Sequence, residues 1–218
     1  MEKKYPTKIP DKYMQGWDNL YNKNLDETKL DELPPHFVHY AVLEFSFFIL
    51  GQENTDKKAL ELATGDGVDA CYLAQLGFDV TALDILSSSV DLTKRRADAL
   101  NVSDKITVIE GDMNKFALKP KSYDVISAVQ CLQYLFDRAL PRMYELLDAI
   151  KPGGYFLYGG NVKPHFKTDP PVRFITLKEL RQALKGWKIH SLAREERLVR
   201  PGDRRGYVWV VAQKPENK

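Results

Sequence analysis

The sequence predicts an α/β fold: a mostly parallel sheet of seven strands with an antiparallel last strand and helices on both faces. Three observations indicate this class. Strand patterns alternate with helical patterns over most of the 218 residues. The glycine turn Thr64-Gly65-Asp66-Gly67 joins the first strand to a helix. The connection over 200–206 is too short for a parallel crossover, so the last two strands are expected to form an antiparallel hairpin.

Two helical segments with aromatic residues at helical spacing precede the glycine turn; they cover 11–23 and 35–50. The polar stretch 51–57 that follows marks a boundary. The predicted organisation is therefore an N-terminal helical cap segment over 1–57 and a ligand-binding domain over 58–218, which together form a single structural domain.

The elements after the glycine turn follow in order. A helix is predicted over 68–76, and a long helix over 132–150 ends at the stop signal Lys-Pro-Gly-Gly of 151–154. Two further helices are predicted over 88–100 and 177–184. The predicted strands cover 59–63, 79–83, 106–110, 123–129, 155–158, 187–199 and 207–212.

Composition fits an ordinary globular enzyme. The net charge of +2 is too small to imply a nucleic-acid partner. The apolar run 37–50 is too short to span a bilayer and is interrupted by Glu44, so no membrane partner is predicted. Cys71 and Cys131 make no disulfide framework, and the expected location is a reducing cytoplasm. The oligomeric state is left open.

The unit over 58–86 is typical of a site for a nucleotide-like cofactor. Its Gly65-x-Gly67-x-x-Ala70 pattern, with Asp84 at the end of the second strand, fits the dinucleotide fingerprint. Nearby acids would oppose a pyrophosphate at the helix N-terminus, whereas S-adenosylmethionine has no phosphate and carries a sulfonium and an ammonium group. These acids are Glu61, Asp66 and Asp69. The charges therefore favour S-adenosylmethionine over NAD.

Five motifs in order resemble those of the class I S-adenosylmethionine-dependent methyltransferases: ELATGDG, ALDIL, EGDM, YDVISAVQCLQYL and KPGGYFLY. The resemblance covers nearly the whole chain and implies a Rossmann-like three-layer sandwich. The Trp17-Asp18-x-x-Tyr21 segment and the terminal hairpin look most like the tellurite-resistance and thiopurine-type methyltransferases, which act on small, soft nucleophiles. Ala63 replaces a frequent glycine. Gln133 stands where many relatives carry histidine, so no histidine base is expected there.

The resemblance also implies roles in cofactor binding. Glu61 would lie near the methionine ammonium, Asp84 would bind the ribose hydroxyls, and Asp112 would accept from the adenine amino group. The other contacts would come from the backbone of Ala63, Thr64, Gly65 and Gly67, from Ile85 and Met113 at the adenine, from Val129 and Gln130 at the sulfonium, and from Trp17 and Tyr21 above the pocket. Helix capping by the two aspartates and core packing of the aromatic pair remain open alternatives.

Three residues are candidates for catalysis on the acceptor side: Gln133, Tyr134 and His165. His165 belongs to the long polar segment 159–172, which is predicted to be a lid or an acceptor-binding element. A general base is needed only for an acceptor that enters protonated, so none of the three is assigned as the base.

Other acceptor-side residues have weaker signals. His36 and His39 have the spacing of a metal pair, but no third ligand is suggested; surface histidines are favoured and no metal is predicted. Cys131 could contact the acceptor. The hairpin arginines could orient an anionic acceptor, although a solvated face is the favoured interpretation. These arginines are Arg194, Arg197, Arg200, Arg204 and Arg205.

The predicted function is transfer of a methyl group from S-adenosylmethionine to a small-molecule sulfur, selenium, tellurium, nitrogen or oxygen nucleophile, with S-adenosylhomocysteine as product. Positioning for in-line displacement can contribute about 7 to 11 kcal/mol. The alternatives are an NAD-dependent oxidoreductase, a methyltransferase for protein or RNA, and a cofactor-binding module without catalysis. Nucleic-acid modification is disfavoured because residues 129–132 lack the motifs of base-modifying DNA enzymes.

Overall fold

The computed structural model describes residues 8–27, 38–163, 172–200 and 203–216. Within them, seven strands form one sheet: β1 (Lys58–Leu62), β2 (Asp79–Asp84), β3 (Ile106–Glu110), β4 (Tyr123–Val129), β5 (Ile150–Lys163), β6 (Lys188–Arg200) and β7 (Asp203–Gln213). The strand order is β3-β2-β1-β4-β5-β7-β6. Strands β1 to β5 pair in parallel, and β7 is antiparallel to both β5 and β6. The predicted fold class is confirmed.

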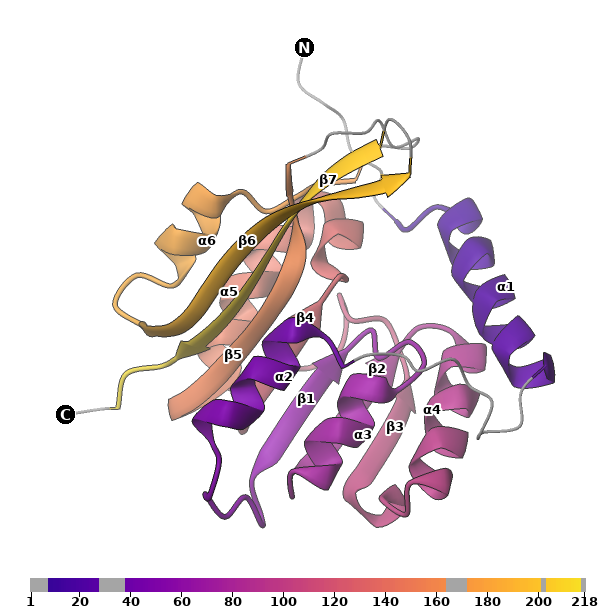
Figure 1. Cartoon of the computed structure of the whole chain (residues 1–218), viewed down its shortest axis with the longest axis horizontal. Helices are drawn as coiled ribbons and strands as arrows, with labels where there is room; N and C mark the ends of the chain where they lie inside the picture. The colour runs from indigo at the N-terminus through magenta and orange to yellow at the C-terminus, as the bar shows by residue number, and fades with distance from the viewer. Residues whose placement is uncertain (1–7, 28–37, 164–171, 201–202, 217–218) are drawn as a thin grey trace.

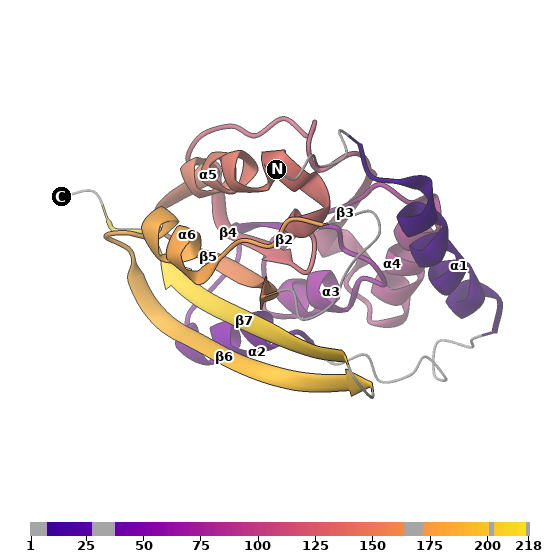
Figure 2. The same cartoon turned by 90° about the horizontal axis from the view of Figure 1, so that it is seen from above.

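Helices cover both faces of the sheet (Figures 1 and 2). The described helices are α1 (Asp11–Glu27), α2 (Tyr40–Phe48), α3 (Val68–Gln75), α4 (Ser87–Ala99), α5 (Ala139–Ala149) and α6 (Leu177–Ala183), with the 3₁₀ segments η2 (Ser103–Lys105) and η3 (Leu132–Arg138). Helices α2, α3 and α4 lie on one face, and η3, α5 and α6 lie on the other. Helix α1 stands outside these layers and contacts α4.

A hydrophobic core fills each side of the sheet, because side chains alternate along each strand. In β1, Leu60 and Leu62 enter one core while Ala59 enters the other, and all three are fully buried. Phe45 anchors α2 to the sheet, with its ring 5.0 Å from that of Tyr155. In the described part of the chain, no helix combines the length and the apolar character needed to cross a membrane.

The predicted helix over 132–150 is wrong as a single element. It divides into η3 and α5, and Phe136 between them has φ 51° and ψ −121°, outside the helical region. This break lets the Phe136 ring enter the core, where it is 2% exposed. Helix α2 also starts later than predicted, with His39 as its N-cap residue; positions 35–37 lie outside the described residues.

Strand β5 is much longer than the predicted 155–158 segment, because the end of the chain pairs with the Lys-Pro-Gly-Gly sequence. Gly153 N donates to Lys214 O at 3.1 Å, and Lys214 N donates to Gly154 O at 2.8 Å. The Lys214 ammonium also donates to the carbonyls of Leu147 and Ile150 at the end of α5, at 2.7 and 2.8 Å. A residue distant in sequence therefore converts a predicted turn into sheet.

Candidate active site

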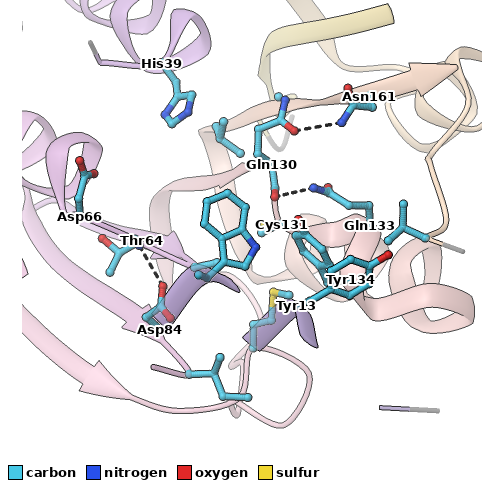
Figure 3. Close-up of a pocket in the computed structure, with 18 of the residues that line it drawn as sticks. Tyr13, His39, Thr64, Asp66, Asp84, Gln130, Cys131, Gln133, Tyr134 and Asn161 are labelled. Atoms are coloured by element: carbon cyan, nitrogen blue, oxygen red, sulfur yellow. Dashed lines mark hydrogen bonds between the residues drawn. The ribbon is translucent and has the colours of Figure 1, made fainter. Parts of the chain in front are cut away.

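A cavity of about 680 Å³ opens at the carboxyl ends of the parallel strands. Its walls come from the turn after β1, the ends of β2, β4 and β5, helix α1, the start of α2, and β7 (Figure 3). The chain reverses its direction of winding between β1 and β4, which are neighbours in the strand order. Open α/β sheets bind ligands at such a switch point, outside the carboxyl ends of the strands.

The cavity brings together most of the residues that the sequence nominated. Both acceptor-side candidates within the described chain, Gln133 and Tyr134, lie in its wall. The nominated cofactor-side residues in the wall are Trp17, Tyr21, Ala63, Thr64, Gly65, Asp84, Ile85, Met113, Val129 and Gln130. Their individual contacts with a cofactor stay predictions.

Three other nominated residues are not among those that line the cavity. Glu61 is 3% exposed beneath the turn, and Gly67 packs against Thr93. The Asp112 carboxylate accepts from Asn114 N at 2.8 Å, which stabilises the turn after β3; no helix begins there, so the helix-capping alternative does not apply. An adenine contact by Asp112 therefore stays a prediction.

The Asp84 carboxylate joins the end of β2 to the glycine turn. Its Oδ2 accepts from Gly65 N at 2.9 Å, and its Oδ1 accepts from Leu86 N at 3.0 Å. Asp84 is 6% exposed. Burial raises the pKa of Asp84 above its usual value, although the hydrogen bonds from Gly65 and Leu86 oppose that shift. Asp84 therefore shapes the turn as well as lining the cavity.

Helix α4 holds the glycine turn from behind. Ser89 Oγ donates to Gly65 O at 2.5 Å, and Arg96 Nε donates to Asp66 O at 2.7 Å. Gly65 and Gly67 have φ values of 59° and 79°, which favour glycine. The turn therefore depends on a helix that follows it by about 20 residues.

Helix α1 closes the cavity above the turn. The rings of Trp17 and Tyr21 stack with centroids 6.1 Å apart, and the Tyr21 hydroxyl lies directly over Gly65. Burial raises the pKa of Tyr21, and the nearby Asp84 and Asp66 charges raise it further. The aromatic pair thus lines the site instead of packing only in the core.

His39 is exposed, as predicted for a surface histidine, and it also lies in the cavity wall. Its Nδ1 lies 2.6 Å from Asp69 Oδ2, and its backbone N donates to Asp69 Oδ1 at 2.9 Å. Nothing in the sequence links these positions, because α2 and α3 meet only in the folded chain. Among the described residues, no group of three histidine, cysteine or acidic side chains could hold a metal; His36 lies outside those residues.

Glu61 is a buried acid that lacks a complete set of partners. Burial raises its pKa above 4.5, and the nearby Asp69 charge raises it further. Within the described residues, Glu61 Oε2 and Thr64 Oγ1 have no hydrogen-bond partner. A cationic group at this end of the cavity would compensate the acid, so the Glu61 carboxylate fits the ammonium of S-adenosylmethionine as a hydrogen-bond acceptor.

We expect the Glu61→Gln variant to unfold at a melting temperature about 2 to 8 °C above that of the wild-type apoprotein at pH 8. Because burial raises the folded pKa of Glu61, its ionisation destabilises the fold as the pH rises above 4.5. The gain should therefore vanish near pH 4, and S-adenosylmethionine affinity should fall. The exposed Glu110→Gln change is the control; an equal gain there would contradict the explanation.

The part of the cavity beside the ends of β4 and β5 contains three linked amides. Gln130, at φ 53°, ends β4 and donates its backbone N–H to Gly159 O at 2.8 Å. Gln133 Nε2 donates to Gln130 O at 2.6 Å, and Asn161 Nδ2 donates to Gln130 Oε1 at 3.3 Å (Figure 3). Asn161 was missed by sequence reasoning because only the pairing of β4 with β5 brings it here.

Aromatic side chains surround these amides. The rings of Tyr13 and Tyr134 meet edge to face at 5.7 Å, and those of Tyr40 and Trp209 stack at 4.8 Å. Tyr13, Tyr40 and Trp209 were not nominated as site residues, and Trp209 belongs to a strand near the end of the chain. Their ring faces suit a flat or apolar acceptor.

The remaining nominated residues divide into three cases. Cys131 lines the cavity but is 1% exposed, and burial, with the Glu61 and Asp84 charges, raises its pKa, which disfavours a thiolate. Arg205 lines the cavity, whereas Arg194 is paired with Glu196 at 3.4 Å on an exposed face. His165 and the side chains of Arg197, Arg200 and Arg204 lie outside what the structure describes.

Comparisons with known proteins agree with this geometry. Residues 59–154 match a family described as a methyltransferase domain. A mitochondrial ubiquinone biosynthesis O-methyltransferase of Schizosaccharomyces pombe is 25% identical over 122 residues, 55% of this chain and 44% of the relative. A fatty-acid O-methyltransferase of Mycolicibacterium smegmatis is 29% identical over 104 residues, 47% of this chain and 36% of the relative. The chain thus matches less than half the length of these relatives.

Solved structures share the fold at low identity. The geranyl diphosphate C-methyltransferase of Streptomyces coelicolor, in complex with S-adenosyl-L-homocysteine, has a TM-score of 0.64 and 14% identity, covering 93% of this chain and 97% of that one. The [4+2]-cyclase SpnF has a TM-score of 0.67 and 15% identity, covering 98% of both chains. Because a cyclase shares the architecture, the fold alone does not assign the reaction.

The sheet order and the cavity at its switch point define a Rossmann-like domain that binds a nucleotide-like cofactor. The match of residues 59–154 to a methyltransferase domain makes this more specific: that part of the chain is similar to methyltransferases, and the match supports S-adenosylmethionine as the cofactor.

Proposed function

We propose that this chain transfers a methyl group from S-adenosylmethionine to a small-molecule nucleophile and releases S-adenosylhomocysteine. The observation that carries the proposal is one cavity with an acidic glycine turn on one side and an amide and aromatic wall on the other. The cofactor supplies an activated methyl group on a positively charged sulfur. The protein's task is then to bind both reactants and hold them in line.

The two sides of the cavity support separate roles, one in binding the cofactor and one in binding the acceptor. Asp84, Ile85 and Met113 are suited to the adenosine part of the cofactor, as the family resemblance implies. Gln130 ends β4 between the two sides, where it would flank the reacting sulfur. Gln133 holds the Gln130 carbonyl in place, so its proposed role is positioning, because a carboxamide does not titrate as a base.

The size and cover of the cavity support a small acceptor over a protein or RNA. A volume of about 680 Å³ lies in the range of ordinary ligand pockets. Helix α1 and strand β7 both contribute to its walls, which narrows access for a macromolecule. Tyr134 faces this end of the cavity, and burial raises its pKa, so its hydroxyl stays protonated and can donate to the acceptor.

The accepting atom can be proposed only by class. The relatives described above are O-methyltransferases, which supports oxygen, while the terminal hairpin and the Trp17-Tyr21 segment support the sulfur, selenium or tellurium chemistry of tellurite-resistance and thiopurine-type enzymes. The aromatic wall supports a flat, apolar molecule. A screen for S-adenosylhomocysteine release with phenols, thiols, amines, tellurite and selenite distinguishes these acceptors.

Acidic residues at the start of α3 argue against an NAD-dependent oxidoreductase. Asp66 lies in the cavity wall at the turn, and Asp69 begins α3, where a pyrophosphate would have to bind. Calorimetric titration should therefore detect S-adenosylmethionine binding and no comparable NADH binding. Preferential binding of NADH would overturn the proposal, and binding of S-adenosylmethionine without turnover in any acceptor class would favour a non-catalytic module.

Two further predictions remain proposals. One is the division into a cap segment over 1–57 and a domain over 58–218. The other is a cytoplasmic location, which is supported by the free thiols of Cys71 and Cys131.

A further inference from the structure

The start of α2 presents a fixed histidine to the cavity. Both Asp69 carboxylate oxygens engage His39, one at the ring Nδ1 at 2.6 Å and one at the backbone N–H at 2.9 Å. The His39 side chain is still 53% exposed, and its ring points toward the cavity interior above Thr64 and Asp66 (Figure 3). With Nδ1 held by Asp69, Nε2 is the nitrogen left to meet a ligand.

Carboxylates from three elements favour the protonated form of this ring. Asp69 of α3, Glu61 of β1 and Asp66 of the glycine turn face His39. Burial lowers the pKa of His39, but the hydrogen bond and charge of Asp69, with the Glu61 and Asp66 charges, raise it overall above 6.5. The protonated His39 ring is thus held at the edge of an acidic site.

Two further groups at the same place can donate to an anion. The start of a helix carries a partial positive charge, and Ala41, in the first turn of α2, lines the cavity. Thr64 is 7% exposed and lines the cavity, and its Oγ1 lacks a hydrogen-bond partner among the described residues. Imidazolium, helix N-terminus and hydroxyl together make an anion subsite beside the buried acid Glu61.

We propose that His39, the N-terminus of α2 and the Thr64 hydroxyl bind the α-carboxylate of the cofactor's methionine arm. The ammonium of the same arm then faces Glu61. The positive and negative groups of the protein are thus placed opposite the negative and positive groups of the zwitterion. The inference rests on the proposed function, because it presupposes S-adenosylmethionine as the ligand. It assigns a binding role to a histidine and a threonine hydroxyl, neither of which the sequence pattern singled out for this group.

The test compares S-adenosylhomocysteine with its decarboxylated analogue, which keeps the ammonium. Calorimetry at pH 6.5 should show that His39→Ala weakens S-adenosylhomocysteine binding by on the order of 10-fold to 100-fold, as expected for a lost charge-assisted hydrogen bond. Binding of the decarboxylated analogue should be unchanged. His190→Ala is the matched control, since His190 bonds Gln213 at 2.9 Å on β6 and is not part of the cavity wall.

The pH dependence gives a second readout. Because the folded pKa of His39 is raised, the charge that binds the carboxylate is present at low pH and is lost as the pH rises through that pKa. Burial raises the pKa of Glu61 to about 8, so its ionisation affects the ammonium of both ligands over the same range. The ratio of the wild-type affinity for S-adenosylhomocysteine to that for the decarboxylated analogue should therefore fall between pH 6 and pH 9 by on the order of 10-fold. Asp69→Asn keeps the histidine but should move the fall to lower pH.

The outcomes separate this inference from the proposed function. If wild type binds both ligands and His39→Ala weakens both equally, the histidine is structural and the inference is overturned while the function stands. A ratio of the affinities for the two ligands that does not change with pH or with Asp69→Asn also overturns it. If wild type binds neither ligand, the cofactor assignment and the inference fail together.

Discussion

Replacing Asp84 by alanine is expected to weaken S-adenosylmethionine binding by about 1 to 3 kcal/mol, since a charged acceptor for the ribose hydroxyls is lost. The structure adds a second effect. Gly65 N and Leu86 N both donate to this carboxylate, so the variant leaves two largely buried N–H groups without their acceptor. We therefore also expect the free energy of unfolding to fall by about 2 to 4 kcal/mol. Calorimetry and urea denaturation measure the two effects.

Asp84→Asn reduces the effect on stability while still removing the charge. The amide keeps the shape but only one acceptor oxygen, so one of the two N–H groups loses its acceptor, and the free energy of unfolding should fall by about 1 to 2 kcal/mol, less than in Asp84→Ala. Affinity for S-adenosylmethionine should still fall, because a neutral acceptor bonds the ribose hydroxyls less strongly. Unchanged affinity in both variants would show that Asp84 does not bind the ribose. Its role would then be limited to the hydrogen bonds with Gly65 N and Leu86 N that shape the turn and the start of α4.

Gly67→Ala is expected to lower the free energy of unfolding by about 2 to 5 kcal/mol, the sum of left-handed backbone strain and overpacking. Gly67 has φ 79°, and an added Cβ would lie 2.9 Å from the Thr93 Cα and 2.8 Å from its Oγ1. These atoms belong to α4, which is packed into the structure and has little freedom to move. Urea denaturation, with the midpoint and slope both recorded, checks the expected loss.

Gly65→Ala is the matched control from the same motif. Gly65 has a similar φ of 59°, but its added Cβ would meet only the Tyr21 hydroxyl, at 2.8 Å. The end of a side chain on α1 can move, so the stability loss should be limited to the strain of about 1 to 2 kcal/mol. Cofactor affinity should fall as Tyr21 shifts over the cavity. Equal destabilisation by the two alanines would contradict the role assigned to Thr93.

Local patterns predicted the elements whose signals are contained in a short stretch. The strands over 106–110 and 123–129 were placed as observed, because apolar runs bounded by turn residues depend on little else. The predictions that were wrong concern elements whose structure depends on residues distant in the sequence. Helix 132–150 breaks at Phe136 because that ring is buried in the core, and the Lys-Pro-Gly-Gly stop becomes part of β5 because Lys214 pairs with it.

The candidate site shows the same limit. Asp84 and the glycine turn were found from the sequence because they lie on consecutive elements with a known spacing. The position of His39 in the cavity wall was not predicted, since it depends on a carboxylate 30 residues away. Asn161 and Trp209 were missed because they reach the cavity through the pairing of β5 with β4 and β7.

The sequence by itself determined the class of this protein: the alternation of strands and helices, the glycine turn, and the acids that disfavour a pyrophosphate. These are properties of neighbouring residues, which local sterics and charge decide. Only the tertiary structure decided which side chains line the cavity and which charges lie near the glycine turn. Those features arise where α1, α2 and β7 close over the carboxyl ends of the strands, and contacts between such distant segments form only when the whole core packs.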